Sequence, residues 1–480
     1  MNKVDFDIII IGSGMGGLVC GCYLAKAGKK VLIVEKNSQP GGYCTSFKRG
    51  NFIIDAAVHC VQNVEKDNIL HKVIQELGID NDIIFKRANP TDTIITKNHK
   101  ININNSIEET IENFLLAFPA ESEKIKNFFG LICSNDFVCI YSKYKNESFK
   151  DVLDNFFKND ELKDIFSIFL GNIGSLPFNT SAVVAFALLK QFILFGGYYP
   201  LGGIQKIPDS FATKFRENGG CLLLKNKVNK IILHNHQVYG IELSTGELIR
   251  SKVVISNSDL TYTFKELLNL QSDDNSRDFF NRLLSYKPSY SIFILYILLN
   301  KRLRDSLDAG PGIWQILDRQ TIESDMSIGQ ENIMLHNGIF LSISSKLDDS
   351  LMPDGTDVVR MITNTEYHGS FFWEKNKDIF SEKLFVQGRK IIPELDNSLI
   401  CKKAIHSETL KNYTLNRDGA VCGWMNSNCQ VNNPIKRYLP VIQNLFFVGH
   451  WITDRYGNGG VAMVADSGRK VAKTILGSFN

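Results

Sequence analysis

Close to its N-terminus the chain runs Phe6-Asp7-Ile8-Ile9-Ile10-Ile11 and then Gly12-Ser13-Gly14-Met15-Gly16-Gly17. A short apolar run that ends in glycines predicts a buried strand that turns at once into a helix. The next apolar run, Lys30-Val31-Leu32-Ile33-Val34, predicts a second strand, and Glu35 closes it. Strand, glycine turn, helix, strand and acid in this order predict an α/β unit of the Rossmann type that binds a dinucleotide.

Each glycine of the turn has its own predicted role. Gly12 makes the sharp turn, Gly14 lets a phosphate approach the backbone, and Gly17 lets the helix pack on the strand. The free N–H groups at the start of the helix then face a pyrophosphate. Glu35 follows roughly 20 residues later, where a carboxylate accepts hydrogen bonds from an adenosine ribose. A glutamate there disfavours the 2′-phosphate of NADP.

A second glycine pair bears on the choice of dinucleotide. It lies in Gln39-Pro40-Gly41-Gly42-Tyr43-Cys44-Thr45, just after the predicted ribose acid. Such a pair lets backbone lie against a long flavin nucleotide, so it favours FAD over NAD, with a simple turn as the alternative interpretation. At the other end of the chain, Asn444 to Gly449 predicts a strand, and Gly459-Gly460 precedes a predicted helix from Val461. We expect the two ends to form two halves of one flavin site.

These motifs resemble those of the family of phytoene desaturases, carotenoid isomerases and retinol saturases. The resemblance covers both ends and the middle of the chain, at Ile11–Leu18, Glu35-Lys36, Pro40–Gly42, Phe52–Asp55, Val58-His59, Gly197–Pro200, Gly202-Gly203, Val254–Asn257, Phe447–Gly449 and Ser467-Gly468. It implies a glutathione-reductase-type FAD domain in an enzyme that desaturates, saturates or isomerises long apolar polyenes or isoprenoids. The predicted cofactor-binding residues are Gly12, Ser13, Gly14, Met15, Gly16, Gly17, Glu35, Lys36, Gly41, Gly42, Tyr43, Cys44, Val228, Gly449, His450, Gly459, Gly460 and Val461.

The chain departs from the family pattern at three places. Ala57 stands where the family commonly has glycine, and His450 stands where it has an acidic residue near the ribityl chain. The stretch Thr453–Tyr456 also lengthens the following loop. Tyr43-Cys44 resembles the isomerase and saturase branches, because desaturases usually place an arginine there. These three departures are compatible with flavin binding, but they weaken the assignment of a polyene substrate by resemblance.

The pattern along the chain predicts two interleaved domains. Residues 1–75, 196–260 and 411–480 are expected to form the FAD-binding domain, and residues 76–195 and 261–410 a helix-rich α+β substrate domain. Val228–Leu233 and Val238–Leu243 predict a hairpin, and by resemblance the backbone at Val228 meets the adenine. Ser291–Leu299 predicts a strand that is buried on both faces.

Composition restricts the class of protein. The chain has 480 residues, a net charge of +3 and ten scattered cysteines without metal-ligand spacing. We therefore expect no metal, no nucleic-acid partner and a cytoplasmic location. The resemblance further implies transient contact with a membrane. The apolar stretch Ser181–Phe195 contains Lys190 and Gln191, and it lies near several phenylalanines. This region is either a tunnel for a lipophilic substrate, a membrane-contacting surface, or an ordinary helical core.

Few residues stand out as catalytic, because flavin chemistry needs mostly position and an apolar hydrocarbon offers no acidic hydrogen. His59 is the first candidate for substrate contact, with a packed or cofactor-stabilising histidine as the alternative. Arg417 and Arg455 are either ligands of a substrate carboxylate or solvated surface residues, and Cys44 and Cys60 are interpreted as packing. Only one dinucleotide fingerprint is present, so net oxidation would need a quinone, oxygen or another electron acceptor.

Two other functions stay open. One is a flavin dehydrogenase or amine-oxidase-like enzyme that acts on a polar or carrier-bound metabolite, in which case polar groups should converge on the flavin. The other is a non-enzymatic protein that escorts prenylated partners. The retained Glu35, Gly41-Gly42 and C-terminal glycines argue against the escort role.

Overall fold

Strand β1 (Phe6–Ile11) lies inside a seven-stranded sheet in the computed structural model, which describes residues 4–269, 274–303, 307–328, 331–438, 441–452 and 459–478. It pairs in parallel with β2 on one side and β12 on the other, and Ile8, Ile9 and Ile10 are fully buried. A parallel strand covered on both faces needs such an unbroken apolar run. The sheet order is β10 (Val228–His234), β11 (Gln237–Leu243), β12 (Leu248–Ser256), β1, β2 (Val31–Val34) and β9 (Cys221–Leu223), with β20 (Leu445–Phe447) paired to β12.

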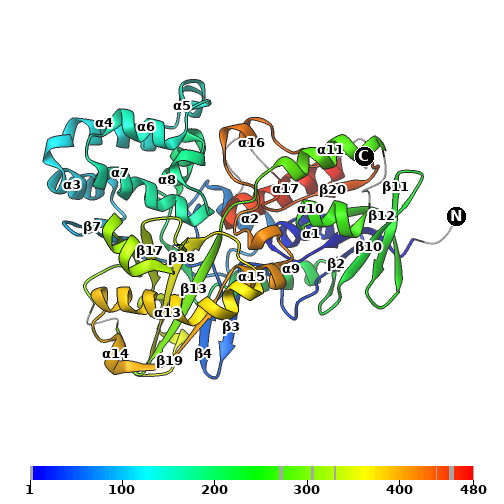
Figure 1. Cartoon of the computed structure of the whole chain (residues 1–480). Coiled ribbons are helices and arrows are strands. Elements are labelled where there is room, and N and C mark those ends of the chain that lie inside the picture. Colours follow the sequence, from blue (N-terminus) through cyan, green and yellow to red (C-terminus); the bar gives the residue numbers. More distant parts are fainter. Residues whose placement is uncertain are drawn as a thin grey trace.

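The first and last helices of the chain pack directly on each other. Helix α1 (Met15–Lys26) follows the glycine turn, and α17 (Val461–Ser478) crosses it beside the sheet (Figure 1). A Cβ on Gly468 of α17 would lie 2.3 Å from the carbonyl oxygen of Gly16, so only glycine allows this approach. Helices α2 (Ile69–Leu77) and α9 (Lys206–Glu217) complete this layer.

A second seven-stranded sheet occupies the other half of the molecule. Its order is β19 (Leu399–Ile405), β13 (Ser291–Leu299), β18 (Asp357–Thr365), β17 (Gly338–Ser342), β14 (Gly312–Ile316), β6 (Asp92–Ile95) and β7 (Lys100–Ile103). All neighbours are antiparallel except β14 and β6. Every residue of β13 is buried, which confirms the predicted strand buried on both faces.

The phenylalanine-rich region folds into a bundle of short helices beside the second sheet (Figure 1). These are α3 (Ile107–Ala117), α4 (Ser122–Cys133), α5 (Phe137–Tyr144), α6 (Phe149–Phe156), α7 (Asp160–Ser167) and α8 (Ala182–Ile193). Phe166 is fully buried, with its ring 4.6 Å from that of Phe128 and 5.1 Å from that of Phe114. Most of these side chains therefore form a helical core. Among the described helices, none combines the length and the hydrophobicity that a membrane-spanning helix requires.

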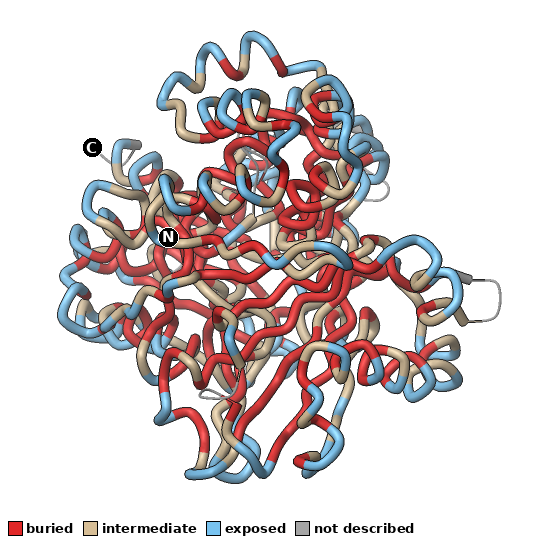
Figure 2. The backbone as a smooth tube through the Cα atoms, turned by 90° about the vertical axis from the view of Figure 1, so that its left-hand side faces the viewer, coloured by how far each residue is buried: buried red, intermediate tan, exposed pale blue. Residues whose placement is uncertain are grey.

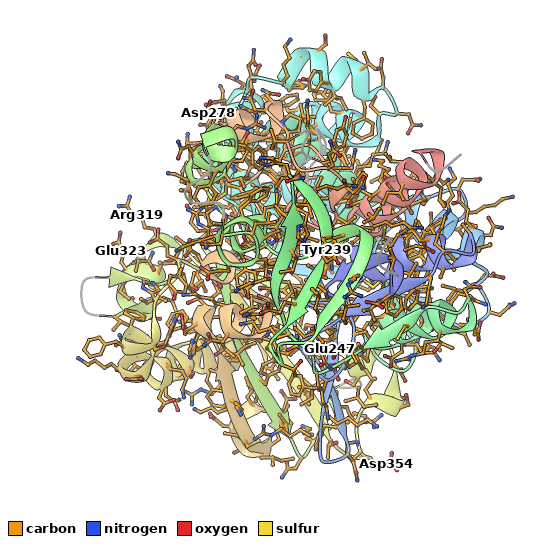
Figure 3. All side chains as sticks on the ribbon, turned by 90° about the vertical axis from the view of Figure 1, so that its right-hand side faces the viewer. Tyr239, Glu247, Asp278, Arg319, Glu323 and Asp354 are labelled. Carbon is orange, nitrogen blue, oxygen red and sulfur yellow. The ribbon has the colours of Figure 1, made fainter. Side chains whose placement is uncertain are left out.

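The predicted hairpin is confirmed by the antiparallel pairing of β10 with β11 around Asn235 and His236, both at positive φ. Figure 3 shows these strands from the front, with Tyr239 on β11 and Glu247 just before β12. Smaller elements are β3 (Ser46–Arg49), β4 (Phe52–Asp55), β5 (Phe85–Arg87), β8 (Tyr198–Pro200), β15 (Ser327–Ile328), β16 (Glu331–Asn332), α10 (Leu260–Tyr262), α11 (Asp274–Ser285), α12 (Arg319–Thr321), α13 (Ser370–Ile391), α14 (Leu395–Ser398), α15 (Ser407–Thr414) and α16 (Asn428–Asn432). Figure 2 shows that buried backbone follows the central strands, whereas exposed backbone lies at the outer turns. The domain boundaries given above stay a prediction.

Candidate functional site

One cavity runs between the two sheets, and both ends of the chain line it. Its nucleotide end contains most of the predicted cofactor-binding residues: Gly12, Gly14, Met15, Glu35, Lys36, Gly41, Gly42, Tyr43, Cys44, Val228, Gly449, His450, Gly460 and Val461. The opposite end, called the substrate end below, is lined by Ala57, Val58, His59, Cys60, Gln62, Gly171, Asn172, Phe192, Ile292, Trp314, His336, Gly338, Phe340, Ile362, Thr363, Asn364, Val421 and Cys422.

The start of α1 opens onto the nucleotide end of the cavity. Gly12 has φ +92°, a left-handed conformation that favours glycine, and its N–H donates to the carbonyl of Val34 at 2.8 Å. Gly14 is the N-cap of α1, and no side chain caps it. The first N–H groups of a helix need an acceptor, and an uncapped helix start suits an anion such as a pyrophosphate.

Glu35 lies buried at the end of β2, where its carboxylate already accepts three hydrogen bonds. Oε2 accepts from the backbone N–H and from the hydroxyl of Ser13, each at 2.8 Å, and Oε1 accepts from the N–H of Asn37 at 2.8 Å. An ionised carboxylate offers about four acceptor positions, so capacity remains for a ribose hydroxyl. Ser13 does not line the cavity, and its contact is with this carboxylate.

Asn257, at the end of β12, joins the two ends of the chain, and the sequence had not marked it as a site residue. Its Nδ2 donates to the carbonyl of Gly12 at 3.4 Å. A Cβ on Gly14 would lie 2.8 Å from Nδ2, and a Cβ on Gly449 would lie 2.6 Å from Oδ1. The motif Val254–Asn257 placed this residue after a strand, but only the pairing of β12 with β1 brings it to the glycine turn.

Three other predicted glycines serve packing around the cavity and do not line it. A Cβ on Gly17 would lie 2.3 Å from the carbonyl oxygen of Gly12, which is the close helix-to-strand contact expected of this position. A Cβ on Gly16 would lie 2.9 Å from the backbone nitrogen of Gly449. A Cβ on Gly459 would lie 2.9 Å from the Ile173 side chain.

The C-terminal wall of the cavity contains a neutral imidazole where the family has an acid. Burial lowers the pKa of His450 to about 4, so the ring carries no charge near neutral pH. The rings of His450 and Tyr43 lie 6.2 Å apart, and the Tyr43 hydroxyl donates to the carbonyl of Ala420 at 3.0 Å. Gly460 has φ +85° and Val461 begins α17 at this wall.

His59 lies at the substrate end, among aromatic rings. Its ring centroid is 4.3 Å from that of Phe340 and 6.5 Å from that of Phe192, and the rings of Phe340 and Trp314 are 4.5 Å apart. Burial lowers the pKa of His59 to about 3, so the imidazole is neutral. The imidazole is therefore a neutral, polarisable part of the cavity wall and not a cationic group.

The other residues discussed from the sequence fall in different places. Cys44 and Cys60 both line the cavity, and burial raises the pKa of each thiol, so neither is an activated nucleophile. Arg417 does not line the cavity, and its Nη1 donates to the carbonyl of Tyr286 at 3.1 Å. Arg455 lies outside the described residues.

Several residues of the substrate end have no local sequence signature. Gln62, Asn172, Trp314, His336 and Asn364 come from segments spread along some 300 residues, and they meet only in the folded chain. The sequence offered one indication of these site residues, namely single polar residues within apolar runs, because a buried amide or imidazole needs a hydrogen-bond partner.

The nucleotide end fits a flavin dinucleotide. The uncapped start of α1 suits the pyrophosphate, the Glu35 carboxylate suits the adenosine ribose, and the glycines at 12, 14, 41 and 42 leave room beside the backbone. The same cavity includes the substrate end, so a second molecule can enter the cavity that holds the cofactor.

Comparisons with known proteins agree with this geometry. Residues 15–296 match the family model described as flavin containing amine oxidoreductase. The prolycopene isomerase 1, chloroplastic, of an Oncidium hybrid cultivar is 24% identical over 460 residues, which cover 88% of this chain and 76% of that protein. The inactive all-trans-retinol 13,14-reductase of Danio rerio is 25% identical over 415 residues, which cover 77% of this chain and 67% of that protein.

A solved structure has the same fold. The oxidoreductase from Methanosarcina mazei superposes with a TM-score of 0.70 at 18% identity, over 97% of this chain and 100% of that one. The fold class predicted from the sequence, a Rossmann-type FAD-binding domain with a second α+β domain, is thereby confirmed, as are the resemblance and FAD as the cofactor. When bound, FAD supplies the transfer of hydride or electrons. The chain belongs to the flavin containing amine oxidoreductase family and is an FAD-dependent oxidoreductase or isomerase.

Proposed function

We propose that this enzyme acts on carbon–carbon single or double bonds of a long, lipophilic, unsaturated substrate of the polyene or isoprenoid type. The observation that carries the proposal is the substrate end of the cavity. The rings of Phe192, Trp314, Phe340 and His59 gather there, and no Asp, Glu, Lys or Arg is among its described lining residues. An apolar cavity lined by aromatic side chains favours an extended hydrocarbon over an ionic metabolite.

The names of the relatives support the same class of substrate. One is named for prolycopene and another for all-trans-retinol. Desaturation, saturation and flavin-dependent cis/trans isomerisation all need a polyene held close to the flavin, with water excluded. The proposed cofactor-binding residues are those named from the sequence that line the nucleotide end of the cavity, and His59 is the proposed substrate contact.

Anaerobic visible spectroscopy of the FAD-loaded protein tests the proposal. Cis and all-trans apolar polyenes are added to the oxidised protein and to the reduced protein. Bleaching of the oxidised flavin means desaturation, reoxidation of the reduced flavin means saturation, and isomer conversion only after reduction means isomerisation. The proposal fails if every polyene leaves both the flavin spectrum and the isomer ratio unchanged.

A second candidate is an amine-oxidase-like or dehydrogenase reaction on a polar metabolite. The amides of Gln62, Asn172 and Asn364 favour it, because they line the same end of the cavity. Small amines, amino acids and their carrier-bound forms are therefore included as competing substrates. Bleaching of the flavin by one of these, with no response to polyenes, would favour the second candidate.

The proposal extends to the partners and the location of the enzyme. Net desaturation needs an external electron acceptor, for which a quinone and oxygen are compared in steady-state assays. A lipophilic substrate has little solubility in water, so we propose a cytoplasmic protein that contacts a membrane surface transiently. Flotation with phospholipid vesicles, with and without polyene in the bilayer, tests that contact.

A further inference from the structure

His336 is held in one orientation at the substrate end of the cavity. It lies between β16 and β17 and is 6% exposed, and its Nε2 is 2.6 Å from the carbonyl oxygen of Ser175. Because a carbonyl oxygen only accepts hydrogen bonds, Nε2 must carry the proton and donate it. The hydrogen bond therefore fixes both the ring orientation and the tautomer.

The second nitrogen of His336 is then an acceptor. Burial lowers the pKa of His336 to about 4, so the ring is neutral near pH 7 and Nδ1 has a lone pair. Among the described residues, Nδ1 has no hydrogen-bond partner. It is also absent from the fully buried side-chain atoms that lack a partner, so Nδ1 is accessible. His336 lines the cavity, so this lone pair is available to a ligand.

Two amides beside His336 also present acceptors. Nδ2 of Asn364 donates to the carbonyl of Gly171 at 3.2 Å, and Nδ2 of Asn172 donates to the carbonyl of Phe169 at 3.1 Å. Asn364 lies next to His336, because the Leu335 N–H donates to the Asn364 carbonyl at 3.1 Å. Each amide thus has its nitrogen engaged with the backbone, and both residues line the cavity, so their oxygens are candidate acceptors for a ligand.

The absence of charged side chains around His336, Asn172 and Asn364 restricts the chemical class of the ligand. The described residues that line the substrate end include no Asp, Glu, Lys or Arg, and both of its histidines are neutral. Burying an ammonium or a carboxylate without an opposite charge is costly, whereas a neutral hydroxyl needs only one acceptor for its proton.

We propose that His336 is a specificity-determining residue, whose Nδ1 accepts a hydrogen bond from a hydroxyl group at one end of an otherwise apolar, unsaturated substrate. This inference rests on the proposed function, since it assigns the polar end of the same substrate. It makes the substrate class a polyene or isoprenoid alcohol, with the chain along Phe340 and Trp314 and the hydroxyl at the corner formed by His336, Asn172 and Asn364.

A matched set of ligands tests the inference. The set contains one polyene with a terminal hydroxyl, its methyl ether, the hydrocarbon, the primary amine and the carboxylic acid. Dissociation constants are measured on the FAD-loaded protein from the change in the flavin spectrum and by equilibrium dialysis. We expect the alcohol to bind about 3- to 10-fold more tightly than the ether, because the ether keeps the oxygen but cannot donate.

Variants separate this role from a structural one. His336→Phe should bring the ratio between the affinities for alcohol and ether to about 1. His336→Gln should restore part of the preference, because a glutamine side chain can donate and accept. His406→Gln is the matched control, since burial also lowers the pKa of His406 to about 4 but this residue does not line the cavity.

The outcomes distinguish the inference from the proposed function. Equal binding of alcohol and ether by the wild-type protein overturns the inference even if His336→Phe does not fold, and it leaves the hydrocarbon assignment intact. Preference for the amine or the acid also overturns it. If no polyene of any kind binds, the proposed function fails and the inference fails with it. If a folded His336→Phe variant still prefers the alcohol to the ether, another residue binds the hydroxyl and the role proposed for His336 is overturned.

Discussion

The guanidinium of Arg360 lies 3.7 Å from the carboxylate of Asp55, and the two side chains are 2% and 1% exposed. Arg360 Nη1 also donates to the carbonyls of Asp55 at 3.1 Å and of Val58 at 3.2 Å. The hydroxyl of Tyr296 donates to the carbonyl of Ala56 at 2.7 Å. The second sheet thus holds the segment that brings His59 to the cavity.

Replacing Arg360 should destabilise the protein strongly. Arg360→Met leaves the buried carboxylate of Asp55 without its counter-ion, and removal of one partner of a buried ion pair costs about 3–5 kcal/mol. The free energy of unfolding, measured with urea by circular dichroism, should fall by this amount. The substitution Arg360→Met should also weaken polyene binding, because the segment that carries His59 loses its attachment to β18.

An exposed ion pair provides the control for this variant. Arg319 and Glu323 are 91% and 65% exposed and lie at the surface in Figure 3, with Nε 2.8 Å from Oε1. Arg319→Met should change the free energy of unfolding by less than about 1 kcal/mol. Equal losses in the two arginine variants would contradict the role given to the buried pair.

Loss of flavin is the expected result at the nucleotide end. Gly14→Val places a branched side chain where a Cβ alone would lie 2.8 Å from the Asn257 amide nitrogen, and Glu35→Ala removes the proposed ribose acceptor. Gly14→Val should abolish and Glu35→Ala should weaken FAD retention, measured as the ratio of flavin to protein absorbance after gel filtration. A Cβ on Gly130 meets no atom within 4 Å, so Gly130→Ala should retain the cofactor. Full occupancy in Gly14→Val would overturn the assignment of this site.

His59→Ala separates substrate contact from cofactor stabilisation. The His59 ring packs against Phe340 at 4.3 Å, so its removal should weaken polyene binding about tenfold, or ~1.4 kcal/mol. FAD occupancy should stay at the wild-type level. A variant that loses FAD and keeps its polyene affinity would assign His59 to the cofactor.

Stability should fall in mild acid because of the buried histidines. The pKa of His59 is about 3 and that of His336 about 4 in the folded protein, against 6.5 for an ordinary histidine. Between these values the unfolded chain binds protons that the folded chain does not. The stabilisation is therefore complete above about pH 6.5 and is lost as the pH falls toward 4 and then 3.

Urea titrations at several pH values measure this dependence. Asp92 acts in the opposite direction, since burial raises its pKa to about 7, so the slope of His336→Phe must be compared with that of the wild type. The variant should lose less stability between about pH 6.5 and 4 than the wild type does. Identical slopes would show that His336 does not resist protonation in the folded state.

Local sequence was sufficient for the nucleotide end. The isoleucines of β1, the glycine turn and the acid after β2 all lie within one short continuous segment, residues 8–35, so their spacing alone predicts their geometry. The same holds for the hairpin of β10 and β11, whose two-residue turn fixes its register. The amino-acid composition of the phenylalanine-rich region was compatible with a tunnel, a membrane-contacting surface or a helical core. Only the packed rings around Phe166 in the structure show that most of the region is a helical core.

The sequence by itself determined the α/β fold class, FAD as the cofactor and the joint role of the two chain ends, because these depend on short motifs with fixed backbone geometry. Only the tertiary structure decided the substrate end. Arg360 lies between Tyr296 and Ser342 because of the register of β18 with β13 and β17, and a slip of one residue would turn its side chain to the other face. Asn364 is placed by the pairing of β18 with β13, and His336 lies beside it because the Leu335 N–H donates to the Asn364 carbonyl; both contacts join segments too distant in sequence for any local pattern to predict.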